Sequence, residues 1–329
     1  MNSPVVSVIV PCYNEEATIG LLLDALYQQT FSKEKTEILI ADGMSTDGTR
    51  GVILFYQDEH PDLHIQIIDN PKRNIPAGVN VAINSASGEF IIRVDAHSKP
   101  YPDYIERSLT ALQLNKGDNV GGVWEIQPGG AGWIARSIAV AASHPLAVGD
   151  ARYRVGGNAQ QVDTVPFGSF RRSLIQKVGG FNENLLTNED YEFNVRVRES
   201  GGVVWFDPSI RSVYFSRPDL LSLARQYFRY GYWKGKMLRR YPATIRWRQF
   251  LPPAFVLSIF ILALLSVFFP VVRWVLTLEI GLYLSILLLV GVYLVLKKRQ
   301  LSLLAGFPLA VATMHTSWGS ALLWSLLRR

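Results

Sequence analysis

The sequence predicts an α/β fold in which a mainly parallel, doubly wound sheet precedes a group of apolar helices. The prediction rests on strand–helix alternation in the first part of the chain, a basic segment at residues 217–249, and long uncharged runs near the C-terminus. The 329 residues allow roughly two domains. Only 18% of them are charged, which excludes a disordered protein. Cys12 is the single cysteine, which excludes a disulfide framework and a thiolate zinc site.

The alternation is visible as short apolar runs separated by segments of helical periodicity. The apolar runs predict buried strands at Val5–Val10, Glu37–Ala41, His64–Ile68, Phe90–Val94 and Val120–Trp124. The segments between them predict helices at Glu15–Gln29 (after an Asn14 cap), Thr46–Glu59, Pro76–Ser87 and Pro102–Leu114. Short strands that alternate with helices are typical of parallel sheets, because each parallel connection needs a crossover.

The net charge of +6 is unevenly distributed along the chain. Residues 1–216 carry a net charge of −7, residues 217–249 one of +8, and residues 250–329 one of +5. These steps predict an acidic α/β domain (1–216), a basic amphipathic region (217–249) and a membrane region (250–329). A basic protein binds nucleic acid or an anionic membrane. Because the positive charge adjoins the apolar runs, we expect membrane lipids and no nucleic acid.

Three runs in the last part are long and apolar enough to span a bilayer, at 251–272, 275–296 and 302–325. Buried core helices are the alternative, although these are usually shorter. The basic region and Lys297–Arg299 are expected on the cytoplasmic side. This predicts a multi-pass protein of the cell (cytoplasmic) membrane with a cytoplasmic α/β domain. Gly306 and Pro308 interrupt the third run, which could instead be re-entrant.

Asp219–Tyr241 has the pattern of an amphipathic helix, with apolar residues on one face and arginines around it. Such a helix is typical of the membrane interface, where its arginines meet anionic lipid headgroups. The alternative is an ordinary helix that caps the α/β domain. Its step into the first apolar run favours the membrane interface.

Polar clusters follow three of the predicted strands, at Pro11–Glu15, Asp42–Asp47 and Asp95–His97. Ligands of doubly wound sheets bind outside the carboxyl ends of the strands. No phosphate loop is present, so carboxylates at these ends predict a divalent cation, Mn²⁺ or Mg²⁺, that holds a ligand's phosphates. Asp42 and Asp47 could instead serve as a turn former and a helix cap.

These segments together resemble a known family. The run VSVIVPCYNE at Val6–Glu15 and the run ADGMSTDGT at Ala41–Thr49 resemble the opening of family 2 glycosyltransferases with the GT-A fold. The resemblance covers roughly residues 5–215 and continues at Asn80, Gly88-Glu89, Asp95-Ala96-His97, Gly179-Gly180-Phe181 and Asn188-Glu189-Asp190. The motif Val94-Asp95-Ala96-His97 and the apolar C-terminal runs are most similar to those of membrane-bound exopolysaccharide glucosyltransferases of the succinoglycan type.

The resemblance implies a nucleotide-sugar site with a Rossmann-like architecture. Its residues would be Pro11, Tyr13, Glu15, Asp42, Asn80 and Asp95. Asp42 would bind the uracil, and Asp95 opens the Asp-x-Asp element that contacts ribose or the metal-bound diphosphate. The last position of that element, usually an aspartate that binds the metal, is His97 here. His97 is therefore either a nitrogen ligand, which suits Mn²⁺ better than Mg²⁺, or a direct contact of the diphosphate.

The resemblance also implies the reaction. Asp190, with Glu189 beside it, matches the catalytic base that deprotonates an acceptor hydroxyl as it attacks the anomeric carbon. One displacement inverts the anomer and turns an α-linked donor into a β-product. The donor would be UDP-glucose or a similar UDP-sugar, and the acceptor a polyprenyl-diphosphate-linked saccharide at the cytoplasmic membrane face. The residues implied beside the diphosphate and acceptor are Gly168, Ser169, Arg171 and Arg172.

Gln226, Arg229 and Tyr230 resemble the Gln-x-x-Arg-Trp element of processive polysaccharide synthases, with tyrosine in the last position. Those enzymes thread the polymer through a larger transmembrane bundle, so a single-addition transferase is favoured here and a processive synthase is the alternative. A non-enzymatic lipid- or nucleic-acid-binding protein is a third interpretation, which the acidic α/β domain disfavours.

Overall fold

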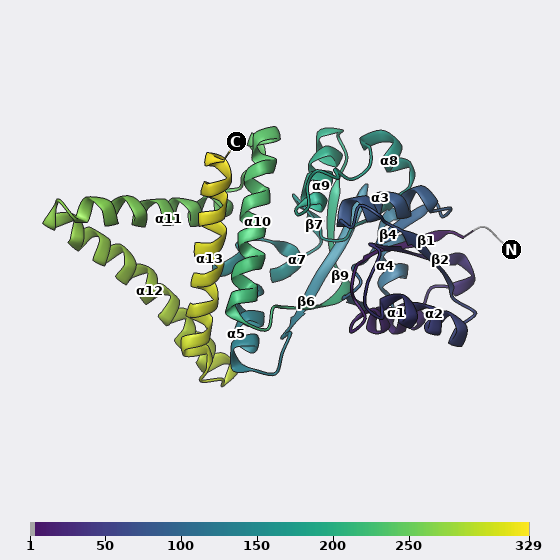
Figure 1. The fold of residues 1–329 in the computed structure, drawn as a ribbon, viewed down its shortest axis with the longest axis horizontal. Coiled ribbons are helices and arrows are strands. Elements are labelled where there is room, and N and C mark those ends of the chain that lie inside the picture. Colours follow the sequence, from purple (N-terminus) through teal and green to yellow (C-terminus); the bar gives the residue numbers. More distant parts are fainter. Residues whose placement is uncertain (1–3, 329) are drawn as a thin grey trace. The chain divides into compact units, whose positions relative to one another are not determined.

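The computed structural model describes residues 4–328, and its contacts divide these residues into two compact units. One unit holds the described residues up to Glu125 together with Gly156–Tyr214, and we call it the α/β unit. The other, the helical unit, holds Ile126–Val155 and the described residues from Phe215 onward. The two units are described separately below (Figure 1).

The α/β unit is built on a mixed sheet with the strand order β3-β2-β1-β4-β8-β6-β9-β5, and β7 pairs with β9. Its strands β1, β2, β3 and β4 are parallel, whereas β8 pairs antiparallel with both β4 and β6. The strands are β1 (Val6–Cys12), β2 (Thr36–Asp42), β3 (His64–Asp69), β4 (Phe90–Arg93), β5 (Lys99–Pro100), β6 (Asn119–Gln127), β7 (Gln160–Gln161), β8 (Ser169–Arg171) and β9 (Val204–Phe215).

Helices cover both faces of this sheet, as the alternating side chains of its strands require. On β1, Val8 and Val10 belong to one buried cluster and Ile9 to another, because successive side chains point to opposite faces. The first cluster includes residues of α1, α2 and α4, and the second includes residues of α3, α8 and α9. The helices are α1 (Ile19–Tyr27), α2 (Thr49–Glu59), α3 (Ile75–Ser85), α4 (Tyr104–Gln113), α8 (Ser173–Val178) and α9 (Glu189–Glu199), with a short 3₁₀ turn at Lys33–Lys35.

These elements confirm the predicted strands and helices, with shifts at their ends. The largest shift is at α1, which begins at Ile19 and not at Glu15. Asn14 has a positive φ of 53°, and its Oδ1 accepts a hydrogen bond of 2.9 Å from the Thr46 N–H. Asn14 therefore joins two loops and does not cap the helix as predicted.

The strand order reverses direction between β1 and β4, since β2 and β3 lie on one side of β1 and β4 on the other. In open α/β sheets, ligands bind outside the carboxyl ends of the strands at such a switch point. The segments that leave these two ends are Tyr13–Glu15 and Val94–His97. The topology therefore selects the same two segments that the sequence singled out.

The helical unit contains the remaining helices of residues 4–328. They are α5 (Trp133–Ala142), α6 (Pro145–Val148), α7 (Arg152–Val155), α10 (Leu220–Arg240), α11 (Trp247–Ser266), α12 (Pro270–Lys298) and α13 (Leu303–Leu327), with a 3₁₀ turn at Pro242–Thr244. α10 and α13 lie side by side over much of their length (Figure 1). Glycines allow this approach, because a Cβ at Gly231 would lie 2.3 Å from the Trp318 carbonyl oxygen.

Two helices of the described residues, α11 and α12, are long and apolar enough to cross a membrane. Their large apolar side chains are mostly exposed, as in Trp247, Phe260 and Leu289. α13, predicted as a third span, is not among these helices. Phe307, Val311 and other residues of α13 are fully buried in the cluster that α5, α10 and α12 share with it. This packing agrees with the alternative interpretation, a buried core helix, and the third span stays a prediction.

The two units also differ from the predicted boundaries. Ile126–Val155 lies in the helical unit, although the prediction placed it in the α/β domain, and residues 217–249 form no separate part. Within Ile126–Val155, α5 ends at Ala142 and α6 begins at Pro145. His144 caps α6 by accepting a hydrogen bond from the Leu146 N–H, and Pro145 occupies the first position of α6.

Candidate active site

The loops after β1 and β4 meet at the switch point of the sheet. His97 Nδ1 lies 2.9 Å from Glu15 Oε1, so an imidazole from one loop contacts a carboxylate from the other. The side chain of Glu15 is 23% exposed and that of His97 is 42% exposed. Tyr13 is also exposed, and its ring packs closely against Gly43. These side chains are accessible to a ligand at the carboxyl ends of the strands.

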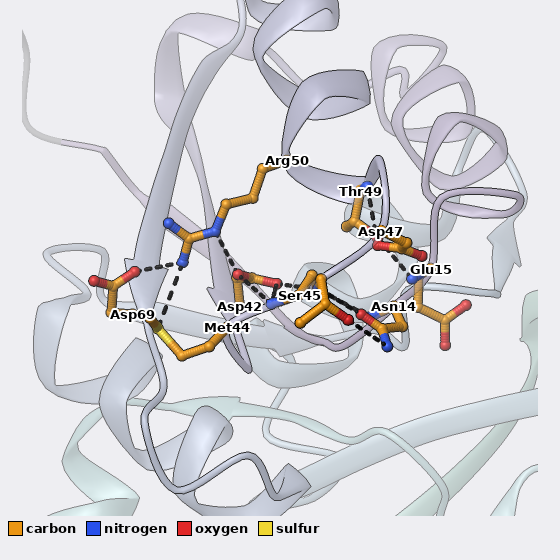
Figure 2. Close-up of polar contacts among 10 residues, drawn as sticks. Asn14, Glu15, Asp42, Met44, Ser45, Asp47, Thr49, Arg50 and Asp69 are labelled. Atoms are coloured by element: carbon orange, nitrogen blue, oxygen red, sulfur yellow. Dashed lines mark hydrogen bonds and ion pairs between the residues drawn. The ribbon is translucent and has the colours of Figure 1, made fainter.

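Asp42, at the end of β2, anchors a second group, which we call the Asp42 corner: Asp42, Ser45, Arg50 and Asp69 (Figure 2). The side chain of Asp42 is fully buried. Its oxygens accept hydrogen bonds from Ser45 Oγ at 2.5 Å, from the Ser45 N–H at 3.1 Å and from Arg50 Nε at 2.6 Å. Arg50 also bonds Asp69 at 2.5 Å, so it joins the ends of β2 and β3.

Asp47 lies in the same loop and ties it to α2. Its Oδ1 accepts hydrogen bonds from the Thr49 N–H at 3.1 Å and from Thr49 Oγ1 at 2.5 Å (Figure 2). The bond to the Thr49 hydroxyl contributes most to lowering the pKa of this carboxyl. Thr49 is the first residue of α2, so Asp47 holds the start of the helix. The N-cap residue itself is Gly48, so the predicted N-cap role of Asp47 is wrong by one position.

A third group, the Asp190 corner, consists of Arg93, Asp95, Glu189 and Asp190. Arg93 is the last residue of β4, and its side chain is only 4% exposed. Its Nη2 donates to Glu189 Oε1 at 2.8 Å and lies 3.4 Å from Asp95 Oδ1. Burial alone would lower the pKa of Arg93, but the carboxylates of Glu189, Asp95 and Asp190 raise it above its ordinary value. Arg93 is therefore a permanent cation between the ends of β4 and α9.

Asp190 lies in the first turn of α9, directly after Glu189. Burial, followed by repulsion from Glu189, raises the pKa of Asp190 to about 7, and the Arg93 cation opposes this rise. The Tyr191 N–H donates to Asp190 Oδ1 at 2.7 Å. A carboxyl with a pKa near neutrality in the company of a buried cation is typical of a general base, because such a group can accept a proton at physiological pH.

The candidate metal ligands are few. Among residues 4–328, no three His, Cys, Asp or Glu side chains are grouped so that they alone could hold a metal ion. Asp95 and His97 nevertheless offer a carboxylate and an imidazole two residues apart on one loop. Mn²⁺ and Mg²⁺ are commonly bound by one or two carboxylates together with substrate phosphates. The donor set therefore fits a cation that is held jointly by the chain and by a phosphorylated ligand.

Asn80, on α3, holds the loop that precedes α9. Its Oδ1 accepts from the Phe181 N–H at 2.7 Å, and its Nδ2 donates to the Phe181 carbonyl at 2.8 Å and to Glu183 Oε1 at 3.0 Å. Phe181 in turn stacks on Phe193 of α9, with ring centroids 4.5 Å apart. Asn80 thus shapes the approach to Asp190 through the backbone of this loop.

The structure separates the four residues predicted beside the diphosphate. The Gly168 carbonyl accepts from the Arg93 N–H at 3.1 Å, and Ser169 is fully buried opposite Ile92. Arg171 lies opposite Phe90, at the start of β4, and pairs with Glu89. Arg172 donates to the Ala86 carbonyl at 2.7 Å. Both arginines therefore lie near the amino end of β4, whereas Asp95 follows its carboxyl end.

Three further predicted site residues, Gln226, Arg229 and Tyr230, belong to α10 in the helical unit. Gln226 is buried, and its Nε2 donates to the Tyr230 hydroxyl at 3.1 Å, whereas Arg229 is exposed. Pro11 is buried at the end of β1, opposite Ala41.

Two arginines that organise the site, Arg50 and Arg93, were missed in the sequence. Arg93 stands in the run Phe90–Val94, whose apolar residues predict a buried strand. A charge inside a buried strand is a signal in itself, because an unpaired buried charge is too costly to retain. Arg50 gave no such signal, because it occupies the first turn of a half-exposed helix.

Comparisons with known proteins identify the family of this chain. Residues 7–179 match the model of glycosyl transferase family 2. The succinoglycan biosynthesis protein ExoA of Rhizobium meliloti (strain 1021) is 31% identical, over 95% of this chain and 92% of the relative. A dolichyl N-acetyl-alpha-D-glucosaminyl phosphate 3-beta-D-2,3-diacetamido-2,3-dideoxy-beta-D-glucuronosyltransferase of Methanococcus voltae is 31% identical, over 74% of this chain and 76% of the relative.

Solved structures share the fold. The mannosyltransferase PcManGT of Pyrobaculum calidifontis, in complex with GDP-Man and Mn²⁺, is 19% identical with a TM-score of 0.60 and covers 96% of this chain and 88% of its own. TarS 1-349 of S. aureus, in complex with UDP-GlcNAc, is 15% identical with a TM-score of 0.51 and covers 96% of this chain and 90% of its own. With the Asp95–His97 loop and the Glu189-Asp190 pair at the carboxyl ends of a GT-A sheet, and with the family model matched over more than half of its length, the chain belongs to glycosyl transferase family 2.

Proposed function

We propose that this glycosyltransferase transfers one sugar from a UDP-sugar, UDP-glucose or a similar donor, to a lipid-linked saccharide, with inversion at the anomeric carbon. The observation that carries the proposal is Asp190: a carboxyl with a pKa of about 7 at the start of α9, linked through Glu189 and Arg93 to Asp95. This arrangement joins a base for the acceptor hydroxyl to the loop expected to bind the donor.

In this proposal the donor's nucleotide binds at the carboxyl ends of β1 and β2. Tyr13 is exposed there, Glu15 lies in the same loop, and the buried Pro11 precedes both on β1. We expect the Asp42 corner to form the edge that faces the nucleobase. The complex of a structural neighbour with UDP-GlcNAc supports a UDP-sugar. Another structural neighbour is bound to GDP-Man. Whether the donor carries uracil or guanine therefore has to be measured.

Asp190 accepts the proton of the acceptor hydroxyl while that oxygen attacks the anomeric carbon. A divalent cation bound by Asp95 and His97 would neutralise charge on the leaving diphosphate. The pKa of the Cys12 thiol is raised to about 12 by burial and by the nearby carboxylates of Glu15, Asp42 and Asp47, so this thiol stays protonated. It therefore supplies no thiolate nucleophile. Our proposal is a single displacement in which Asp190 acts as the base.

The acceptor is proposed to be a polyprenyl-diphosphate-linked saccharide at the cytoplasmic face of the cell membrane. α11 and α12 are apolar and exposed, which supports membrane association. The exposed face of α10 carries Arg225, Phe228, Arg229 and Arg240, which suits contact with anionic headgroups. The Methanococcus voltae relative is named for a dolichyl-phosphate saccharide, a lipid-linked acceptor.

The processive alternative depends on Gln226, Arg229 and Tyr230, which resemble an element of processive synthases. In α10 the Tyr230 hydroxyl accepts a hydrogen bond from Gln226 of its own helix, which supports a role of this pair within the helical unit. The length of the product decides between the alternatives. One added sugar per acceptor supports our proposal, and a ladder of many sugars contradicts it.

The test is a donor screen with the full chain purified in detergent, in which released nucleoside diphosphate is measured with an added lipid-linked acceptor. We expect release with a UDP-sugar, its loss on chelation of divalent cations, and its recovery with Mn²⁺. Replacing His97 by Ala should raise the Mn²⁺ concentration needed for half-maximal rate. Turnover that is unaffected by chelation would contradict the metal assignment. Turnover with a GDP-sugar, but with none of the UDP-sugars, would contradict the donor assignment.

A further inference from the structure

Arg93 and Arg196 both pair with a glutamate of α9, and they differ in how their donors are used. Arg196 bonds Glu192, with Nε at 3.0 Å from Oε1 and Nη2 at 2.8 Å from Oε2. Its Nη2 also donates to the Gly180 carbonyl at 2.8 Å and its Nη1 to the Gly179 carbonyl at 3.2 Å. Every nitrogen of this guanidinium has a partner, as expected of an arginine that stabilises a fold.

Arg93 is more deeply buried and much less satisfied. Only its Nη2 makes hydrogen bonds, to Glu189 and at longer range to Asp95, while its Nε and Nη1 have no partner among residues 4–328. The ring of Phe181 lies 5.7 Å from the guanidinium carbon and contributes a cation–π contact. Buried donors without partners are rare in folded proteins, and a catalytic role is one of the explanations for such a group, beside a bound water or ion.

The partners of Arg93 come from two segments far apart in the sequence. Asp95 belongs to the loop after β4, which the proposed function assigns to the donor, and Glu189 begins α9, which carries the proposed base. Glu189 is 8% exposed, so its pair with Arg93 is shielded from water and held in one geometry. Moving either segment would break a buried ion pair, and the distance between the two is thereby fixed.

We propose that Arg93 is a positioning residue of the transfer reaction, which holds the Glu189-Asp190 pair at its working distance from the donor-side Asp95. This proposal rests on the proposed function, because it assigns the proton transfer to Asp190. Arg93 acts through its carboxylate partners, so its removal should slow the chemical step far more than it weakens donor binding.

The test compares kcat and the KM for the donor in the full-length protein. We expect Arg93→Met to lower kcat by about 100-fold, the lower end of what a general base contributes, with the donor KM changed less than about threefold. Arg93→Lys keeps the cation and should recover part of the rate. The matched control is Arg196→Met, which also breaks an arginine–glutamate pair on α9 and should lower the unfolding midpoint while leaving kcat near that of the wild type.

A double-mutant cycle separates positioning from general damage to the fold. If Arg93 acts through Asp190, Arg93→Met should cause no further loss of kcat in the Asp190→Asn background, because groups that work as a unit are not additive. Independent, multiplying losses would contradict the proposal, and so would equal kcat losses in Arg93→Met and Arg196→Met. Wild-type transfer by Asp190→Asn would overturn the proposed function and this inference together. A loss in Asp190→Asn beside normal kcat in Arg93→Met would overturn this inference alone.

Discussion

The Asp42 corner and the Asp190 corner are built from the same groups, an arginine between carboxylates at the ends of neighbouring segments, but they are satisfied to different degrees. At the Asp42 corner, both oxygens of Asp42 accept hydrogen bonds, and Arg50 bonds carboxylates on two strands. At the Asp190 corner, two donors of Arg93 have no partner among the described residues, and the pKa of Asp190 is raised to about 7.

The difference indicates different tasks. A carboxylate whose oxygens both accept hydrogen bonds is held in one position, which suits a corner that shapes a loop for the ligand. A carboxyl near its pKa, beside a second carboxylate and an unsatisfied cation, can gain and lose a proton with little cost. We infer that the Asp42 corner is a support and that the Asp190 corner performs the chemistry.

The largest expected effect is that of Asp190→Asn. The amide keeps the shape of the side chain but cannot accept a proton, so kcat should fall by about 10²- to 10⁴-fold. The unfolding midpoint should not fall, because the substitution removes a charge that burial and Glu189 disfavour. Both quantities can be measured on the same detergent-solubilised sample.

The control for this prediction is Glu192→Gln, one turn into the same helix. Glu192 pairs with Arg196, so this variant should lose stability and keep its kcat. An Asp190→Asn variant that lost both activity and stability would erase the distinction between the two corners.

A smaller effect, on stability, is expected at the Asp42 corner. Asp42→Asn weakens charge-assisted hydrogen bonds from Ser45 and Arg50, at a cost of about 2 kcal/mol in the free energy of unfolding. Its kinetic effect should appear in the donor KM and not in kcat at saturating donor. Urea unfolding, followed by tryptophan fluorescence, is measured for Asp42→Asn, Arg50→Met and the double variant. The three values give the interaction free energy between Asp42 and Arg50. Fully additive losses from the two changes would contradict a single cooperative corner.

The smallest effect is expected for Asp47→Ala. The variant loses the bonds to Thr49 at the start of α2, so a slight decrease in the unfolding midpoint should follow. The Mn²⁺ concentration for half-maximal rate should stay that of the wild type. A shift of that concentration would instead show that Asp47 belongs to the metal site.

Much of the fold was predictable because its elements are local. The apolar runs and their helical spacers led to β1–β4, β6 and α1–α4, with errors confined to ends such as the start of α1. The separation of the units was not predictable from charge, because the path of Ile126–Val155 into the helical unit depends on tertiary packing. α13 was predicted as a span because residues 302–325 form a long run without charged side chains, although α13 is not among the helices that are apolar enough to cross a membrane.

The positions of site residues were predictable where the residues directly follow the end of a strand. They were less predictable where strand register or an ion pair determines the position of the side chain. Glu15 and His97 meet as the switch point requires. Arg171 follows Gly168 by only three residues, yet the antiparallel register of β8 carries it to the start of β4. Arg93 required the opposite inference, since its one charge within a buried strand signals a partner that only the fold identifies as Glu189.

The most direct test of the central claim is the pH dependence of kcat at saturating substrates. In our proposal the ionised form of Asp190 is the base. Burial and Glu189 raise the pKa of Asp190 to about 7, although Arg93 opposes the rise and Asp95 adds to it. We therefore expect kcat to fall about tenfold for each pH unit below 7 and to level off above it. A kcat that stays constant between pH 5.5 and 8, a range chosen to bracket roughly that pKa, would contradict the assignment of Asp190 as the base.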